Sequence, residues 1–181
     1  PQFAKTDRTT LLDYNRKQAD SAVELENVEL APLVETVVSA HYSLPARAKM
    51  TMHIPTSISK QQLQPAEPML LMSVLDNLYS NAVHYGLNPV TFAFAAAYMV
   101  HGFILMSSIQ AHPFRQEERA MIFEPFFQGS HQRKRAVKGS GLGLSIARDC
   151  IAVCKGNCIW STRAGQDVRF RIELPSSKNT K

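Results

Sequence analysis

The pattern of apolar positions predicts a long amphipathic helix near the middle of the chain. Between residues 71 and 85, apolar side chains recur every three or four positions, at Leu71, Val74, Leu75, Leu78, Ala82 and Tyr85. This spacing gathers them on one face of a helix, which we expect to be buried. Asn77, Asn81 and His84 form a second stripe at the edge of that face, where we expect them to line the rim of a cavity.

Apolar runs in the second half of the chain predict strands. Residues 168–174 alternate apolar and polar side chains, and with the stretch around Trp160 they predict a final strand pair with one buried face. Residues 90–109 carry no charged side chain and are about as long as a membrane-spanning helix. Because polar residues interrupt this run, we expect two buried strands joined near His101 and Gly102, and no membrane span.

A shorter strand and helix are predicted nearer the start. Residues 28–30 predict an edge strand, and Pro32 marks the first position of a helix that carries Leu33, Val34, Val37 and Val38. The chain has 181 residues, of which 45% are hydrophobic and 19% charged. This composition is enough to bury the core of one compact domain.

A glycine-spaced turn, Gly139-Ser140-Gly141-Leu142-Gly143-Leu144, leads into an amphipathic stretch. Glycine tolerates backbone angles that other residues resist and carries no side chain, so peptide N–H groups can close around anionic oxygens. The following helix would add the positive end of its dipole. The turn therefore predicts a phosphate cradle, although a tight turn before a helix uses the same residues for conformational reasons alone.

The asparagine stripe offers a metal ligand beside such a cradle. The amide oxygen of Asn81 is a hard, neutral ligand suited to a magnesium ion that is otherwise held by water and substrate phosphates. Alternatively, Asn77 and Asn81 only satisfy each other or nearby backbone groups at the helix border. The glycine turn favours the metal site.

Three segments occur in an order and spacing that resemble a known family: residues 77–85, residues 123–127 (Phe-Glu-Pro-Phe-Phe) and residues 139–144. They resemble three sequence boxes of the ATP-binding domain, of the GHKL or Bergerat type, in two-component sensor histidine kinases. The resemblance implies an α/β two-layer sandwich in which helices cover one face of a mixed β-sheet. It also implies a histidine protein kinase, with ATP and Mg²⁺ as cofactors.

The resemblance assigns roles to particular residues. Asn81 matches the catalytic, magnesium-binding asparagine, Asn77 its partner one turn earlier, and Tyr85 the aromatic residue that closes the box. His84 stands where a lysine is common, so its contact with phosphate becomes conditional on protonation. Gly139, Gly141, Leu142 and Gly143 match the phosphate-binding turn.

A lid over the nucleotide is implied for residues 128–138. This segment carries four cationic side chains, Arg133, Lys134, Arg135 and Lys138, of which we expect Arg133 and Lys138 to contact the nucleotide. Cations on such a segment can fold over a triphosphate, although a run of surface charge is more often a solvated loop.

The chain departs from the family where an Asp-x-Gly-x-Gly element normally binds the adenine amino group. Residues 109–113 read Ile-Gln-Ala-His-Pro instead. An amino group without its acceptor in a buried pocket costs about 1–3 kcal/mol. Either nucleotide binding is weakened, or another group such as Gln110 substitutes, or residues 87–115 are not what the gene encodes, as after a compensated reading-frame slip.

The resemblance also implies which parts of a sensor kinase are present. It assigns residues 1–20 to the end of the dimerisation and phosphoacceptor helix, 21–27 to a linker, 28–176 to the catalytic domain and 177–181 to a polar tail. None of the six histidines is followed by an acidic residue. We therefore expect the phosphorylated histidine, with the sensor and membrane segments, to precede Pro1.

The partners implied are the protein's own dimerisation hairpin, in a homodimer, and a response regulator. The implied location is the cytoplasmic part of a bacterial inner-membrane protein.

Three rival functions remain open. The net charge of +5 and the basic lid segment could indicate nucleic-acid binding, but exposed aromatics are not interleaved with the charges. A pseudokinase-like module that does not bind ATP productively is a second reading, because of the altered adenine element. A hydrolytic ATPase is less favoured, since Asn77 occupies the position of the water-activating carboxylate and cannot act as a general base.

The sulfur-containing residues are predicted to be structural. Cys150, Cys154 and Cys158 lack a Cys-x-x-Cys pair or a nearby histidine, so we expect buried, reduced thiols and no metal site. Five methionines are expected to fill the core: Met69, Met72, Met99, Met106 and Met121.

Overall fold

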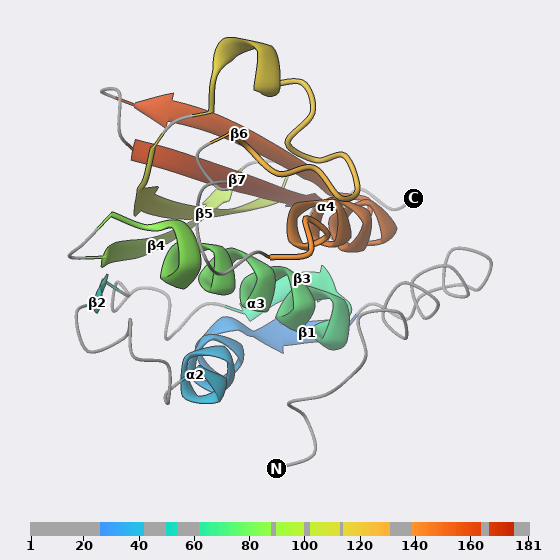
Figure 1. The fold of residues 1–181 in the computed structure, drawn as a ribbon. Helices are drawn as coiled ribbons and strands as arrows, with labels where there is room; N and C mark the ends of the chain where they lie inside the picture. The colour runs from blue at the N-terminus through green and yellow to red at the C-terminus, as the bar shows by residue number, and fades with distance from the viewer. Residues whose placement is uncertain are drawn as a thin grey trace.

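The computed structural model describes residues 26–41, 50–53, 62–87, 90–99, 102–112, 114–130, 139–163 and 167–175. These residues form two sheets and three α-helices (Figure 1). The predicted opening helix, most of the predicted linker, most of the lid and the polar tail lie outside the described residues. No described helix is long and apolar enough to cross a membrane.

Helix α3 (Pro68–Tyr85) is the central helix of the fold and confirms the amphipathic pattern. Its buried face includes Leu71, Val74, Leu75, Leu78 and Ala82, each at most 2% exposed. The helix begins at Pro68 because the side chain of Glu67 accepts a hydrogen bond from the backbone N–H of Leu70 at 2.6 Å and caps the first turn. Proline suits that turn because its missing N–H would have no helical partner.

The main sheet has five strands in the order β2-β4-β5-β7-β6. Strands β4 (Val90–Met99) and β5 (Gly102–Gln110) form an antiparallel hairpin, as predicted for the uncharged run. Strands β6 (Asn157–Arg163) and β7 (Asp167–Pro175) form the predicted final pair. Because β2 (Met50–His53) runs parallel to β4 while the other pairs are antiparallel, the sheet is mixed, as the resemblance implied.

Helices cover one face of this sheet. Alternate residues of β7 are buried at Val168, Phe170, Ile172 and Leu174, and in register with them lie Leu105, Ser107 and Ile109 of β5. Helices α3 and α4 (Gly143–Val153) pack on this inner face (Figure 1). The opposite face exposes side chains such as Met106 and Ile159. The α/β two-layer sandwich is therefore confirmed.

A group of smaller elements lies on the side of α3 that faces away from the main sheet. Strands β1 (Glu26–Glu29) and β3 (Gln62–Ala66) pair with each other, and α2 (Leu30–Ala40) packs on α3 through buried residues such as Leu33, Val34 and Val37. The prediction for this region was wrong in detail, because Leu30 starts the helix and Pro32 lies two residues inside it. Leu30 is fully buried, and this burial favours the earlier start.

Sulfur-containing side chains divide into two groups. All three cysteines are free and buried, as predicted. Met72 packs against the core, but Met69, Met106 and Met121 are exposed, so the prediction that these three fill the core was wrong. Met106 lies on the uncovered face of the sheet, and Met121 lies in a turn.

Candidate functional site: the asparagine helix and the glycine turn

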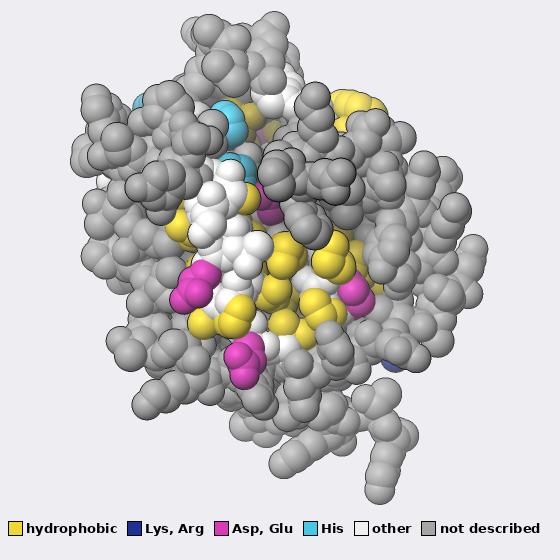
Figure 2. Space-filling view, turned by 90° about the horizontal axis from the view of Figure 1, so that it is seen from below, with side chains coloured by type: hydrophobic (Ala, Val, Ile, Leu, Met, Phe, Trp, Pro, Cys, Tyr) yellow, Lys and Arg dark blue, Asp and Glu magenta, His cyan; other side chains and the backbone are white. Residues whose placement is uncertain are grey.

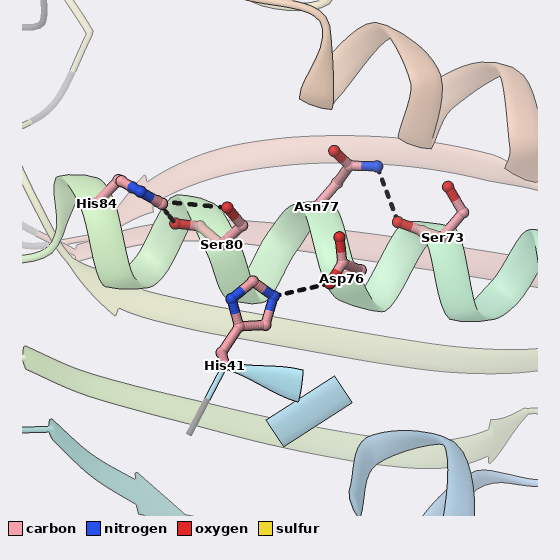
Figure 3. Close-up of polar contacts among 6 residues, drawn as sticks. All are labelled: His41, Ser73, Asp76, Asn77, Ser80 and His84. Carbon is pink, nitrogen blue, oxygen red and sulfur yellow. Dashed lines mark hydrogen bonds and ion pairs between the residues drawn. The ribbon is translucent and has the colours of Figure 1, made fainter. Parts of the chain in front are cut away.

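One edge of α3 carries Asn77, Asn81 and Tyr85, and each of these side chains is half-buried. They are spaced four residues apart, so they lie in a row along the helix. The Nδ2 group of Asn77 donates a hydrogen bond to the backbone carbonyl of Ser73 at 2.8 Å (Figure 3). This bond fixes the amide plane and leaves the Oδ1 atom directed away from the helix.

The glycine turn lies along this row of side chains. A Cβ atom placed on Gly139 would lie 2.5 Å from the phenolic oxygen of Tyr85, and one on Gly143 would lie 2.9 Å from Oδ1 of Asn77. The turn therefore runs antiparallel to α3. The two contacts lie on either side of Asn81, which is midway between Asn77 and Tyr85. The rise of the helix over that interval, about 12 Å, is close to the reach of the four residue steps from Gly139 to Gly143.

Gly141, at the middle of the turn, meets a third segment of chain. Its φ of 74° lies in the left-handed region, and a Cβ atom there would lie 2.6 Å from the carbonyl carbon of Phe126 and 2.8 Å from the carbonyl oxygen of Phe127. Only a glycine permits both the angle and the contact. The segments singled out in the sequence at 77–85, 123–127 and 139–144 therefore meet in space.

Helix α4 begins at Gly143, inside the glycine turn, and no side chain caps its first residues. The N-cap residue is Leu142, whose carbonyl accepts the backbone N–H of Ile146 and the hydroxyl of Ser145, both at 2.9 Å. The first N–H groups of a helix have no partner within the helix. With no acidic residue in the first turn, the positive end of α4 suits an anion.

His84 turns back on its own helix. Its Nδ1 atom lies 2.7 Å from the backbone carbonyl of Ser80 and 3.3 Å from the Ser80 hydroxyl, and its side chain is exposed (Figure 3). A phosphate contact from His84 would have to come from Nε2. Its predicted nucleotide contact stays a prediction.

Arg133 and Lys138 lie outside the described residues, so their predicted contacts stay predictions as well. The start of the predicted lid is described at Gln128, whose side-chain amide donates a hydrogen bond to the carbonyl of Gly139. Gln128 thus joins the segment after Phe127 to the start of the glycine turn. Apart from the position of Gln128 after the aromatic segment, no sequence pattern predicted this contact.

The strand end that replaces the Asp-x-Gly-x-Gly element is apolar on its inner side. Ile109 is buried in the core at 6% exposure, whereas the Gln110 side chain is exposed. Successive residues of a strand point to opposite faces, so Gln110 cannot replace an acceptor in the direction of Ile109. Its backbone carbonyl accepts the N–H of Leu87 at 2.6 Å, which ties the strand to the end of α3.

A polar contact that sequence reasoning missed joins the end of α2 to α3. The Nε2 atom of His41 lies 2.7 Å from Oδ1 of Asp76 (Figure 3). The centre of the His41 ring lies 5.2 Å from that of the Tyr79 ring. The two residues are far apart in sequence, so no periodicity links them. Half of the Asp76 side chain is exposed, so solvent screens the pair.

Comparison with known proteins places this geometry in a family. The family described as histidine kinase-, DNA gyrase B-, and HSP90-like ATPase matches residues 66–178. The chain belongs to that ATPase family. The match spans α3, the segment 123–127 and the glycine turn, which build the candidate site, and also the final strand pair.

Two curated relatives in this family are sensor histidine kinases. The chain is 68% identical over 173 residues to sensor histidine kinase GlrK of Escherichia coli K12, a match that covers 94% of this chain and 35% of GlrK. Sensor histidine kinase QseE of Escherichia coli O157:H7 gives the same identity and coverage. The chain thus spans about a third of the length of these relatives.

Solved structures of the family show the same fold. The nucleotide-free catalytic domain of histidine kinase ThkA has a TM-score of 0.71 at 22% identity and covers 85% of this chain and 97% of that one. ThkA in complex with response regulator protein TrrA has a TM-score of 0.72 at 19% identity, covering 96% of this chain and 48% of that one.

Proposed function

We propose that this chain is the ATP-binding, phosphodonor part of a two-component sensor histidine kinase. It would supply the γ-phosphoryl group to a histidine outside this chain, from which the group passes to an aspartate of a response regulator. The observation that carries the proposal is the convergence of α3 and the glycine turn, in which Asn77 touches Gly143 and Tyr85 touches Gly139. Family membership and the two sensor kinase relatives support it.

The residues present fit a magnesium-bound polyphosphate. A Cβ atom on Gly139, Gly141 or Gly143 would lie 2.9 Å or less from an atom of Tyr85, Phe126 or Asn77, so only glycines let the turn lie this close to α3 and to the Phe126 segment. Asn81 would offer its amide oxygen to Mg²⁺, and the N–H groups at the start of α4 would face phosphate oxygens. When bound, the metal neutralises phosphate charge, while the protein mainly orients and neutralises the transferring group.

The apolar strand end lowers the affinity expected for adenine. With Ile109 buried and Gln110 exposed, an adenine amino group facing Ile109 would have no acceptor there. The cost of about 1–3 kcal/mol corresponds to a loss of about fivefold to 150-fold in affinity. This departure makes a pseudokinase-like module the second candidate function.

A nucleic-acid interface is less favoured because two arginines of β7 and one of α4 are paired with carboxylates. In β7, Nη2 of Arg169 lies 2.8 Å from Oδ2 of Asp167, and Nη2 of Arg171 lies 2.5 Å from Oε1 of Glu173. In α4, Nη1 of Arg148 lies 3.7 Å from Oε1 of Glu124. The face seen from below shows hydrophobic and acidic side chains among its described residues (Figure 2). The described surface therefore presents no stripe of unpaired cations such as a phosphate backbone requires.

The remaining partners are those of a whole sensor kinase. We propose a response regulator, since the relatives are sensor kinases and ThkA, which shares the fold, was solved with TrrA. We also propose a homodimer through the dimerisation hairpin, of which residues 1–20 would be the end, and a position at the cytoplasmic side of a bacterial inner membrane. Residues 21–27, 28–176 and 177–181 would be linker, catalytic domain and tail.

The test is titration calorimetry of this chain with Mg²⁺ and a nonhydrolysable ATP analogue. We expect one site per chain, dependence on Mg²⁺, and a loss of affinity of at least about tenfold in Asn81→Asp, because the new charge repels the phosphates. The same change at the exposed Asn157 of β6 is the matched control and should bind like the wild type. A wild-type chain that does not bind the analogue, or an Asn81→Asp variant that binds normally, would refute phosphodonor function.

A further inference from the structure

Glu118 is a buried carboxylate that the proposed function does not use. Only 7% of the residue is exposed. It lies at the end of the short 3-10 helix Gln116–Glu118, which carries no label in Figure 1. This helix belongs to the segment between β5 and the glycine turn. Burying a carboxylate is costly unless it is hydrogen-bonded.

Both carboxylate oxygens of Glu118 accept backbone hydrogen bonds. Oε2 accepts the N–H of Arg115 at 2.9 Å, and Oε1 accepts the N–H of Ser130 at 2.6 Å. One side chain thus joins the two ends of the segment 115–130. Hydrogen bonds to an ionised acceptor are among the strong ones in proteins.

The segment held in this way is the one that supports the glycine turn. Between its ends, the N–H of Glu124 bonds to the carbonyl of Met121, and that of Phe127 to the carbonyl of Glu124. Phe126 then adopts a φ of 65°, which is uncommon for a bulky residue. That conformation brings the carbonyls of Phe126 and Phe127 against Gly141, while the Gln128 side chain bonds to the carbonyl of Gly139.

We propose that Glu118 is the positioning residue of the nucleotide site, setting nucleotide affinity by holding segment 115–130 against Gly139 and Gly141. The proposal rests on the proposed function, because it assumes that the glycine turn contacts phosphates. Glu118 itself touches no nucleotide; it acts through the backbone of Phe126 and Phe127 and through Gln128. The ion pair of Arg148 with Glu124 also reaches this segment, but both side chains are exposed, so it is weak by comparison.

The test compares Glu118→Gln with Glu117→Gln in the same calorimetric titration with Mg²⁺ and the nonhydrolysable ATP analogue. The glutamine at 118 keeps the size of the side chain but presents an NH₂ group to one of the two N–H donors. We expect the dissociation constant to rise about tenfold with an unchanged number of sites. Glu117 is exposed, 4.0 Å from Arg115, and its variant should bind like the wild type.

The number of sites separates positioning from simple loss of structure. A variant that is only partly folded shows fewer sites at an unchanged dissociation constant, and that result would overturn the proposal. So would a Glu118→Gln dissociation constant within about twofold of the wild type. A wild-type chain without binding would instead remove the proposed function itself.

Trp160 provides a local readout. It is the single tryptophan of the chain, its ring meets that of Phe114 edge to face at 5.5 Å, and the Arg119 guanidinium lies 5.9 Å from its centre. We expect its emission in Glu118→Gln to differ from the wild type before ligand is added. Weakened binding with unchanged Trp160 emission would contradict an effect through this segment.

A second variant covers the case in which Glu118→Gln does not fold. Gln128→Ala removes the bond to the Gly139 carbonyl and leaves the Glu118 contacts in place. We expect it to raise the dissociation constant with the number of sites unchanged, and an unchanged dissociation constant would overturn the proposal.

Discussion

Gly141 shows how one residue can join two segments of a site. A side chain at this position would strain the left-handed backbone and would clash with the Phe126 carbonyl group. The sequence predicted a glycine turn, but it could not show which chain the middle glycine touches. The contact between Gly141 and Phe126 is a tertiary contact, and the pattern of the residues between the two segments does not predict it.

Replacing Gly141 with Ala should destabilise the protein and weaken nucleotide binding. The strained φ and the 2.6 Å approach to a backbone atom give an expected cost of about 1–3 kcal/mol in the free energy of unfolding. Urea unfolding followed by Trp160 fluorescence measures this cost. Gly129→Ala is the control, since its nearest neighbour would be the Phe114 ring at 3.3 Å, and an equal loss in both variants would contradict the explanation.

Predictability differed among the residues of the site. Asn77 and Asn81 follow from helical periodicity alone, because residues spaced by four share one face of a helix. Periodicity placed Tyr85 on the apolar face, and only the resemblance assigned it to the site. His84 belongs to the same pattern, yet its ring bonds to the Ser80 carbonyl, a local competition that periodicity does not reveal. Glu118 could not be predicted from the sequence, because Arg115 is not a residue that forms a capping box and the bond from Ser130 is a tertiary contact.

At the scale of elements, segment 115–130 behaves as a loop closed by one carboxylate. Burial raises the pKa of the Glu118 carboxyl, but the backbone N–H groups of Ser130 and Arg115 outweigh it, so the pKa lies below its usual value of 4.5. The ionised form is therefore the one that the folded protein stabilises.

The stability that Glu118 contributes should depend on pH with a definite sign. Because its folded pKa is lowered, the contribution is fully present above pH 4.5 and is lost as the pH falls through the folded pKa. Glu118→Gln should unfold with about 1–3 kcal/mol less free energy at neutral pH, and the difference should shrink below pH 4.5. Urea titrations from about pH 7 to about pH 3 measure it, and a difference that grows on acidification would have the wrong sign.

The regular elements were the most predictable part of the fold. Helix α3 and the β4–β5 hairpin follow from apolar spacing and from the polar break near His101, because both burial patterns are local. The strand order β2-β4-β5-β7-β6 was not predictable from periodicity, since it depends on which strands pair across long separations. The resemblance supplied that architecture only in outline.

At the scale of the whole molecule, the three cysteines lie in the core formed by the helices and the sheet. Cys150 and Cys154 lie on and just after α4, and Cys158 lies on β6. Burial raises the pKa of the Cys154 thiol, and it raises that of Cys158 to about 11. The thiols of Cys154 and Cys158 are therefore protonated at neutral pH and shielded from a thiol reagent.

Alkylation by iodoacetamide at pH 8 should be slow in the folded protein and fast in urea. A ratio of rates of at least about a hundredfold is expected, because reaction requires both opening and ionisation. If Mg²⁺ and the ATP analogue bind only the folded chain, they should slow alkylation further. Mass spectrometry of the modified protein measures the rates, and rapid labelling of native Cys158 would show that α4 and β6 separate without unfolding.

The position of β7 inside the sheet has a consequence for how the protein is made. β7 pairs with β5 on one side and with β6 on the other, although it is the last strand to be synthesised of the five. During translation the asparagine helix and the glycine turn both emerge before the strand that completes the surface beneath them. The nascent chain should therefore remain unable to hold a nucleotide until residue 175 has left the ribosome, so this fold is completed late in synthesis.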